Sequence, residues 1–305
     1  VDAGGNAVVK VEVPAEWANI VVKEEEHTAD AARPDFVKKI VDPINALKGD
    51  LLPVSAFNGR EDGTWDNGTA AYEKRGIAVN VPEWKIGNCN QCAYVCPHAV
   101  IRPFLATEEE AAASGVEWKQ GLGETKEYKF RIQISPMDCT GCSNCVDVCP
   151  AKDKALVMRP LEEQMPQQKN WDYITKNIGY KQVVDKTKSV KNLQFAQPLF
   201  EFSGACAGCG ETPYIKAISQ LFGDKMMVAN ATGCTSPYCT NAAGQGPAWA
   251  NSLFEDNAEF GLGMHVGVEK LRDRVQETME KAIANCTKCS EELKAVMKEW
   301  IENRG

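Results

Sequence analysis

Alternating hydrophobic and polar residues predict two strands in this chain. Residues 8–14 alternate with a period of two, and so do residues 127–135. In the second stretch the apolar side chains share one face of the strand. They are Tyr128, Phe130, Ile132 and Ile134. A single apolar face of this kind is typical of burial in a core rather than of a cofactor site.

Helical spacing of apolar residues marks further elements. Residues 35–50 show this spacing, interrupted by Pro43. An acidic helical piece is predicted at residues 107–115, and a long amphipathic helical region at residues 268–304. Residues 161–200 lack a strong period and therefore predict a linker.

Charge and hydrophobicity restrict the class of protein. The chain has 305 residues, 44% of them hydrophobic, and a net charge of -8. An acidic chain argues against a nucleic-acid partner, which usually requires a basic surface. We find no run of about 18 apolar residues and no signal-peptide pattern. We therefore expect no membrane partner and a cytoplasmic protein, and the start at Val1 indicates a processed or partial polypeptide.

Cysteine usage indicates metal chemistry. The chain contains 13 cysteines, and none of them lies in residues 1–88. Disulfide frameworks belong mainly to small secreted domains, whereas close CxxC clusters in a chain without a signal peptide are typical of metal or cluster ligands.

The strongest motif has the spacing C-x2-C-x2-C-x3-C and is followed by Pro150. Its four cysteines are Cys139, Cys142, Cys145 and Cys149. This is the bacterial ferredoxin spacing, in which three thiolates bind one 4Fe-4S cluster and the fourth binds the other cluster. The alternative, a zinc site, would need only two CxxC pairs in a tetrahedral arrangement.

An earlier run repeats this motif with three cysteines instead of four. They are Cys89, Cys92 and Cys96, and the position equivalent to Cys139 is occupied by Ile86. An isoleucine side chain cannot bind iron, so this run is one ligand short.

Crossed ligation then predicts two unequal sites. The first has all of its ligands, Cys139, Cys142, Cys145 and Cys96. The second has Cys89, Cys92 and Cys149. Two interpretations of the second site stay open: three thiolates hold a three-iron or a weakly completed four-iron cluster, or three residues including a cysteine are missing after Cys89. The second interpretation is preferred because the rest of the motif is intact.

A third cysteine group lies at a glycine-rich turn. Cys206 and Cys209 form a C-x2-C pair, with Cys234 further along the chain. Glycines in this turn allow backbone amides to approach a bound group closely. A helix is predicted to begin at Thr212 and Pro213, with the threonine as a possible cap.

Together these motifs resemble pyruvate:ferredoxin oxidoreductase. The matching stretches lie between about residues 53 and 264 and include NQCAYVCPHAVIRPF, CTGCSNCVDVCP, FEFSGACAGCGETPYIK and GPAWANSLFEDNAEFGLGM. The resemblance implies oxidative decarboxylation of pyruvate with coenzyme A, using thiamine diphosphate, Mg²⁺ and three 4Fe-4S clusters. It also implies ferredoxin or flavodoxin as the electron carrier, and a homodimer of the full enzyme.

The same resemblance suggests roles for residues in the last third of the chain. Cys206, Cys209 and Cys234 resemble three of the four ligands of the cluster nearest the thiamine, and Glu211 resembles a residue close to that cofactor. The GDG motif for the diphosphate is absent, because only Gly223 precedes an aspartate there. Diphosphate, magnesium and catalytic residues therefore stay unassigned, and the chain is expected to be part of a longer enzyme.

These observations predict an α+β chain with four parts. They are a connecting segment at residues 1–76, a ferredoxin-like domain with two 4Fe-4S clusters at 77–160, a linker at 161–200, and a partial α/β thiamine diphosphate-binding domain at 201–305. Two other functions are compatible with the motifs: an oxidoreductase for another 2-oxoacid, and a non-catalytic polyferredoxin that only transfers electrons.

Cys286 and Cys289 lie three residues apart on a predicted helix. Solvent-facing thiols are the preferred interpretation, because no second pair or histidine accompanies them. A redox pair or half of a metal site is the alternative.

Overall fold

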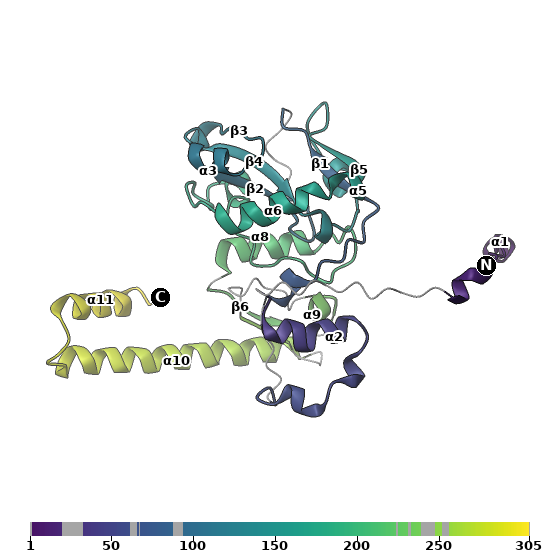
Figure 1. Cartoon of the computed structure of the whole chain (residues 1–305). Coiled ribbons are helices and arrows are strands. Elements are labelled where there is room, and N and C mark those ends of the chain that lie inside the picture. Colours follow the sequence, from purple (N-terminus) through teal and green to yellow (C-terminus); the bar gives the residue numbers. More distant parts are fainter. Residues whose placement is uncertain are drawn as a thin grey trace. The chain divides into compact units, whose positions relative to one another are not determined.

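The computed structural model describes residues 2–19, 33–61, 66, 68–87, 94–223, 225–230, 233–238, 248–251 and 256–304 (Figure 1). The chain divides into two compact units, Val1–Glu61 and Asp62–Gly305. The division falls after Glu61, whereas the sequence placed the end of the connecting segment at residue 76.

The first unit contains only helical elements in its described part. They are α1 (Asp2–Asn6), η1 (Ala15–Asn19), η2 (Val37–Val41), α2 (Asp42–Asn45), η3 (Gly49–Leu51) and η4 (Val54–Phe57). The strand predicted at residues 8–14 is wrong. Val8, Val9 and Val11 are exposed, and alternation alone does not form a strand where no partner strand is available.

The interruption predicted at Pro43 is wrong, because η2 continues directly into α2 through this residue. The helical segment ends at Asn45 rather than at residue 50. The turn before the proline is a π-helix, in which the Asp42 N–H donates to the Val37 carbonyl. Proline has no N–H, and its ring clashes with a carbonyl four residues earlier. A wider turn relieves that clash. Arg33 stabilises this helical segment by donating to both carboxylate oxygens of Asp42 at 2.8 and 2.9 Å.

Two small antiparallel sheets form the centre of the second unit. Strands β2 (Ile101–Ala106), β4 (Lys129–Ile134) and β3 (Lys119–Gln120) form one sheet in the order β2-β4-β3. Strands β1 (Asn80–Trp84) and β5 (Leu156–Pro160) pair to form the other. Pro103 lies in the edge strand β2, where a missing N–H is tolerated.

The alternation predicted for β4 is confirmed. Phe130, Ile132 and Ile134 are at most 1% exposed and belong to the main hydrophobic core. Cys96, Cys139, Cys145 and Cys149 are part of the same core. The sulfur-bearing loops are therefore fixed by the packing of the sheet.

The acidic helix between β2 and β3 is also confirmed. It is α3 (Glu108–Ala113), and it begins with a capping box in which Thr107 and Glu110 satisfy each other's backbone N–H groups. Lys181 reaches Glu110 at 2.8 Å. The second unit also contains four short helical segments, η5 (Thr69–Tyr72), η6 (Gly123–Thr125), η7 (Pro136–Asp138) and α4 (Asn144–Asp147).

Residues 161–200 are not the plain linker that the sequence predicted. They contain α5 (Leu161–Gln164), α6 (Pro166–Asn177) and α7 (Val190–Leu193). Helix α6 packs against β4 and buries Trp171 and Ile174. Only a narrow apolar stripe faces the sheet, so the polar residues on the other side obscured the helical period.

The last part of the chain contains α8 (Thr212–Phe222), β6 (Met227–Asn230), α9 (Thr235–Tyr238), β7 (Ala248–Asn251), α10 (Asn257–Asn285) and α11 (Glu291–Glu302). β6 and β7 are parallel, and α10 contacts β6, which is an α/β arrangement. Helix α8 begins at Thr212 as predicted, but Glu211 is its N-cap residue and makes no side-chain cap bond.

The predicted long C-terminal helical region is two helices joined by a turn. Cys286 and Cys289 lie in this turn and form a disulfide. The preferred interpretation of two solvent-facing thiols on one helix is therefore wrong. None of the helices in the described ranges is long and apolar enough to cross a bilayer.

Candidate metal centre

The complete cysteine run forms a tight loop between η7 and β5. Cys139 follows η7, Cys142 lies in the loop and Cys145 lies in α4. Gly141 has φ +70°, and an added Cβ would lie 3.2 Å from the carbonyl oxygen of Asn80. Glycine is therefore required there both for the backbone angle and for the close approach of β1.

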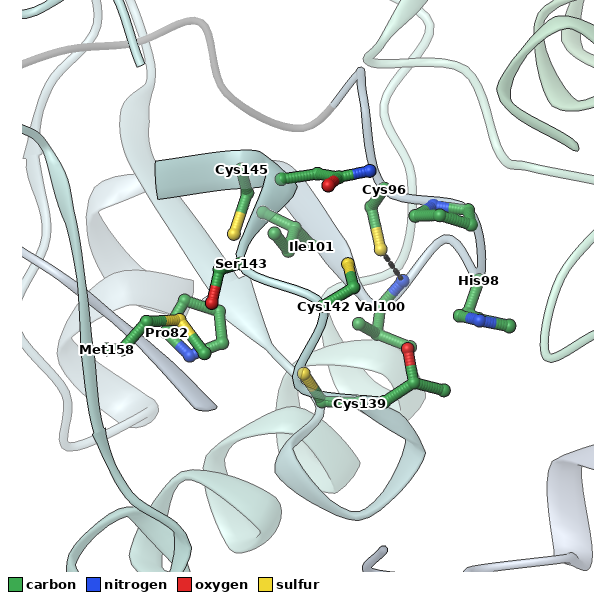
Figure 2. Close-up of a pocket in the computed structure, with 13 residues that line it drawn as sticks. Pro82, Cys96, His98, Val100, Ile101, Cys139, Cys142, Ser143, Cys145 and Met158 are labelled. Atoms are coloured by element: carbon green, nitrogen blue, oxygen red, sulfur yellow. Dashed lines mark hydrogen bonds between the residues drawn. The ribbon is translucent and has the colours of Figure 1, made fainter. Parts of the chain in front are cut away.

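Four thiols line one pocket, and they come from both cysteine runs. They are Cys96, Cys139, Cys142 and Cys145. Figure 2 shows these side chains pointing toward one another, with Pro82, Ile101 and Met158 around them. The set is the one that crossed ligation predicts for the complete cluster. Its assignment as a ligand set stays a prediction.

The donor set of the pocket fits an Fe-S cluster. The four thiols have apolar neighbours, among them Pro82, Ile101 and Met158, and thiolates are the ligands that Fe-S clusters use. Among the residues that the structure describes, no group of three or more His, Cys, Asp or Glu could hold a single metal ion.

Backbone amides point at two of these sulfurs. The Val100 N–H donates to the Cys96 Sγ at 3.4 Å, and the Gly141 N–H donates to the Cys139 Sγ at 3.4 Å. Hydrogen bonds of this kind tune the potential of an Fe-S cluster. They also orient the thiols toward the pocket.

Burial raises the pKa of two of these thiols, those of Cys139 and Cys145. Burial raises the pKa of Cys139 to about 12, with the nearby Cys96 and Cys142 adding to the effect. Burial also raises the pKa of Cys145. Thiols must lose their protons to bind iron. The positive charge of the bound iron ions would therefore offset the rise in the pKa of Cys139 and of Cys145.

Cys149 lies apart from the pocket that the other three cysteines of its run line. It is 5% exposed, and its Sγ accepts a hydrogen bond from the Ala155 N–H at 3.2 Å. Its predicted partners, Cys89 and Cys92, lie outside the described residues. Ile86 lies in a turn after β1 and is partly buried. Both interpretations of the second cluster therefore stay predictions.

The third cysteine group begins in a turn that contacts the ligand loop. The Cys209 N–H donates to the Cys206 carbonyl at 3.1 Å, and Gly208 in this turn has φ +74°. The Asn144 amide donates to the Gly208 carbonyl at 3.4 Å. An added Cβ on Gly208 would lie 3.5 Å from the Cys142 Cβ.

The other predicted residues of this group are solvent-accessible. Cys206 and Cys234 are exposed, and Cys209 is partly buried. Glu211 is exposed at the start of α8. Cys234 directly precedes α9 in a short described segment, 233–238. Their roles in binding a third cluster or thiamine diphosphate stay predictions.

Sequence reasoning missed several buried or partly buried polar residues near the cysteine loops. They are Lys74, Arg102, Asp138, Asn144 and Lys216. Each of them has a partner 64 or more residues away in sequence, so no local period marks them. The acidic residue directly before Cys139 was the one local clue.

Lys216 holds the end of the first cysteine run. This lysine of α8 is 4% exposed, and its Nζ donates to the carbonyl oxygens of Tyr94 at 2.9 Å and Cys96 at 3.4 Å. Burial lowers its pKa to about 8.

We expect Lys216→Met to destabilise the folded state by about 1–3 kcal/mol, because two carbonyls lose their donor. Iron should also be lost faster to a chelator, since Cys96 is held less firmly. Denaturant unfolding and chelator-dependent bleaching of the cluster absorbance measure these effects. The control is Lys225→Met at an exposed position. Equal bleaching rates in the two variants would contradict this role for Lys216.

Comparison with known proteins identifies the chain's relatives. A family described as a 4Fe-4S dicluster domain matches residues 87–152. The EKR family, described as a domain of unknown function, matches residues 23–78. Pyruvate-flavodoxin oxidoreductase from Klebsiella pneumoniae is 50% identical over 99% of the chain, and the enzyme of the same name from Enterobacter agglomerans is 49% identical over 100%. Pyruvate:ferredoxin oxidoreductase from Moorella thermoacetica is 48% identical over 100% of the chain.

The chain corresponds to a segment of a pyruvate:ferredoxin/flavodoxin oxidoreductase. It spans 26–27% of the length of these three curated relatives. The dicluster match includes both cysteine runs, so the prediction of a 4Fe-4S dicluster domain in this pyruvate:ferredoxin oxidoreductase segment is confirmed.

Proposed function

We propose that this segment transfers electrons within an enzyme that oxidises pyruvate with coenzyme A to acetyl-CoA and CO₂. The reaction releases two electrons and one proton, and an Fe-S cluster carries one electron at a time. Three 4Fe-4S clusters would pass these electrons to ferredoxin or flavodoxin. The observation that carries the proposal is the pocket lined by Cys96, Cys139, Cys142 and Cys145 in a chain 48–50% identical to such enzymes.

The contact between two cysteine-bearing loops supports an internal electron route. The turn of Cys206 and Cys209 would hold the third cluster, together with Cys234. This turn contacts the ligand loop through Gly208 and Asn144. A cluster on the turn and a cluster in the pocket would be neighbours, and an electron could pass between them without an intervening layer of protein.

The remaining features of the proposal rest on the relatives. Thiamine diphosphate supplies carbanion chemistry at the substrate carbon when it is bound. No described residue forms a diphosphate or Mg²⁺ site that we can assign, and Glu211 is our candidate neighbour of the cofactor. A homodimer in the cytoplasm is the expected form of the full enzyme.

The test uses the full-length enzyme, purified without oxygen. Pyruvate and coenzyme A together should bleach the cluster absorbance and then reduce added ferredoxin or flavodoxin, and removal of thiamine diphosphate should abolish both effects. A preparation with full iron that retains no thiamine diphosphate would instead be a polyferredoxin. Reduction by another 2-oxoacid in preference to pyruvate would reassign the substrate.

A further inference from the structure

A lysine from the EKR region forms an ion pair directly beside a predicted cluster ligand. Lys74 pairs with Asp138, whose side chain is 3% exposed. The Ser135 hydroxyl donates to the Oδ2 atom of the same carboxylate at 2.5 Å. The Gly76 N–H donates to the Met137 carbonyl at 2.9 Å. Asp138 ends η7, and Cys139 follows it immediately.

The same ammonium group also reaches the segment that leads to the third cysteine group. The Lys74 Nζ lies 4.8 Å from the centroid of the Phe202 ring. Phe202 has φ +50°, and its N–H donates to the His98 carbonyl at 3.1 Å. Cys206 follows four residues later. Lys74 therefore contacts both the loop of Cys139 and the segment before Cys206.

Glu73 and Arg75, which flank Lys74 in the sequence, form an ion pair with each other. The Arg75 Nε donates to the Glu73 carboxylate at 2.5 Å, and Arg75 is exposed enough for this to be a surface pair. Of these three residues, Lys74 is the one that pairs with a buried carboxylate, that of Asp138. That carboxylate has an electrostatic effect at the sulfur: it adds to the rise in the pKa of Cys139 that burial causes.

We propose that Lys74 is a positioning residue that neutralises Asp138 beside Cys139 and thereby raises the reduction potential of the cluster bound by Cys96, Cys139, Cys142 and Cys145. The inference rests on the proposed function, because it requires a cluster in that pocket. A buried negative charge near a cluster opposes the addition of an electron, and a paired ammonium group removes that opposition. This gives the EKR stretch a role in setting a potential.

The experiment measures midpoint potentials by EPR-monitored titration of the anaerobic full-length enzyme. Asp138→Asn keeps the hydrogen-bond acceptor and leaves the Lys74 charge unopposed, so the potential should shift to a more positive value. Adding Lys74→Gln to Asp138→Asn removes that charge in a background without a carboxylate, so the potential should return toward that of the unmodified enzyme. Lys74→Arg with Asp138→Asn keeps the charge and should match Asp138→Asn alone.

Lys188→Gln is the matched control, because Lys188 forms a surface pair with Glu124. It should leave the potential unchanged. Equal potentials in Asp138→Asn and in the glutamine double variant would overturn the inference, since a purely structural role does not depend on the charge. If Lys74→Gln with Asp138→Asn loses iron, the potential of Lys74→Arg with Asp138→Asn decides. Any difference between that potential and the potential of Asp138→Asn alone would overturn the inference. Unmodified enzyme without iron would overturn the proposed function instead.

Discussion

Cys142→Ala is expected to lower the iron content of the full-length enzyme from about twelve to about eight per chain, because one of three 4Fe-4S clusters loses a ligand. Pyruvate-dependent ferredoxin reduction should fall by more than about 100-fold, since even outer-shell changes at metal sites cost about 10–100-fold. Cys142 lines the pocket, and its Cβ lies 3.5 Å from the position of a Cβ added to Gly208. Loss of the pocket cluster would therefore interrupt the route between the other two.

Two companion variants test whether the ligands cross between the runs. Cys96→Ala should abolish the same EPR signal as Cys142→Ala, because both side chains line one pocket. Cys149→Ala should abolish a different signal, because its sulfur lies outside that pocket. Cys286→Ala changes a cysteine in a disulfide and should leave the iron content unchanged. If Cys149→Ala abolishes the same signal as Cys142→Ala and Cys96→Ala abolishes a different one, crossed ligation is contradicted.

Arg102→Met is expected to destabilise the folded state by about 3–5 kcal/mol, because it leaves a buried carboxylate without its partner. The Arg102 and Glu201 side chains are 5% and 9% exposed and form an ion pair. The Arg102 Nε also donates to the Ala99 carbonyl at 2.6 Å. Its guanidinium lies 4.8 Å from the centroid of the Trp171 ring.

The position of Arg102 explains why this loss should extend to the cluster. Ala99 has φ +55°, a left-handed conformation that is strained for a residue with a Cβ. Arg102 stabilises this turn three residues after Cys96. The midpoint of denaturant unfolding, followed by cluster absorbance, measures the effect. Arg102→Met with Glu201→Met should recover part of the stability, since no unpaired charge remains.

A surface pair provides the control for Arg102. Arg159 and Glu83 are 48% and 40% exposed, so Arg159→Met should change stability by less than about 1 kcal/mol. Similar losses of stability in Arg102→Met and Arg159→Met would contradict a structural role for the buried pair of Arg102 and Glu201.

The sequence predicted the features that local spacing determines. The motif of Cys139, Cys142 and Cys145 was predicted to form one site with Cys96, and the structure places all four side chains in one pocket. The apolar face of β4 and the acidic helix α3 were also predicted, because each depends on residues two to four positions apart. The roles of these cysteines as ligands stay predictions.

The features that sequence reasoning missed depend on distant partners. Helix α6 buries a narrow stripe, Trp171 and Ile174, against a sheet whose strands are elsewhere in the chain. The pairs of Lys74 with Asp138 and of Arg102 with Glu201 join residues 64 and 99 positions apart. Charges of this kind look like ordinary surface residues until the fold buries them.

The most direct test of the central claim is an iron-edge anomalous difference map of the anaerobic full-length enzyme. We predict a compact group of four iron atoms bound by the sulfurs of Cys96, Cys139, Cys142 and Cys145. A zinc ion, a disulfide or metal-free thiols at these four cysteines would contradict the account.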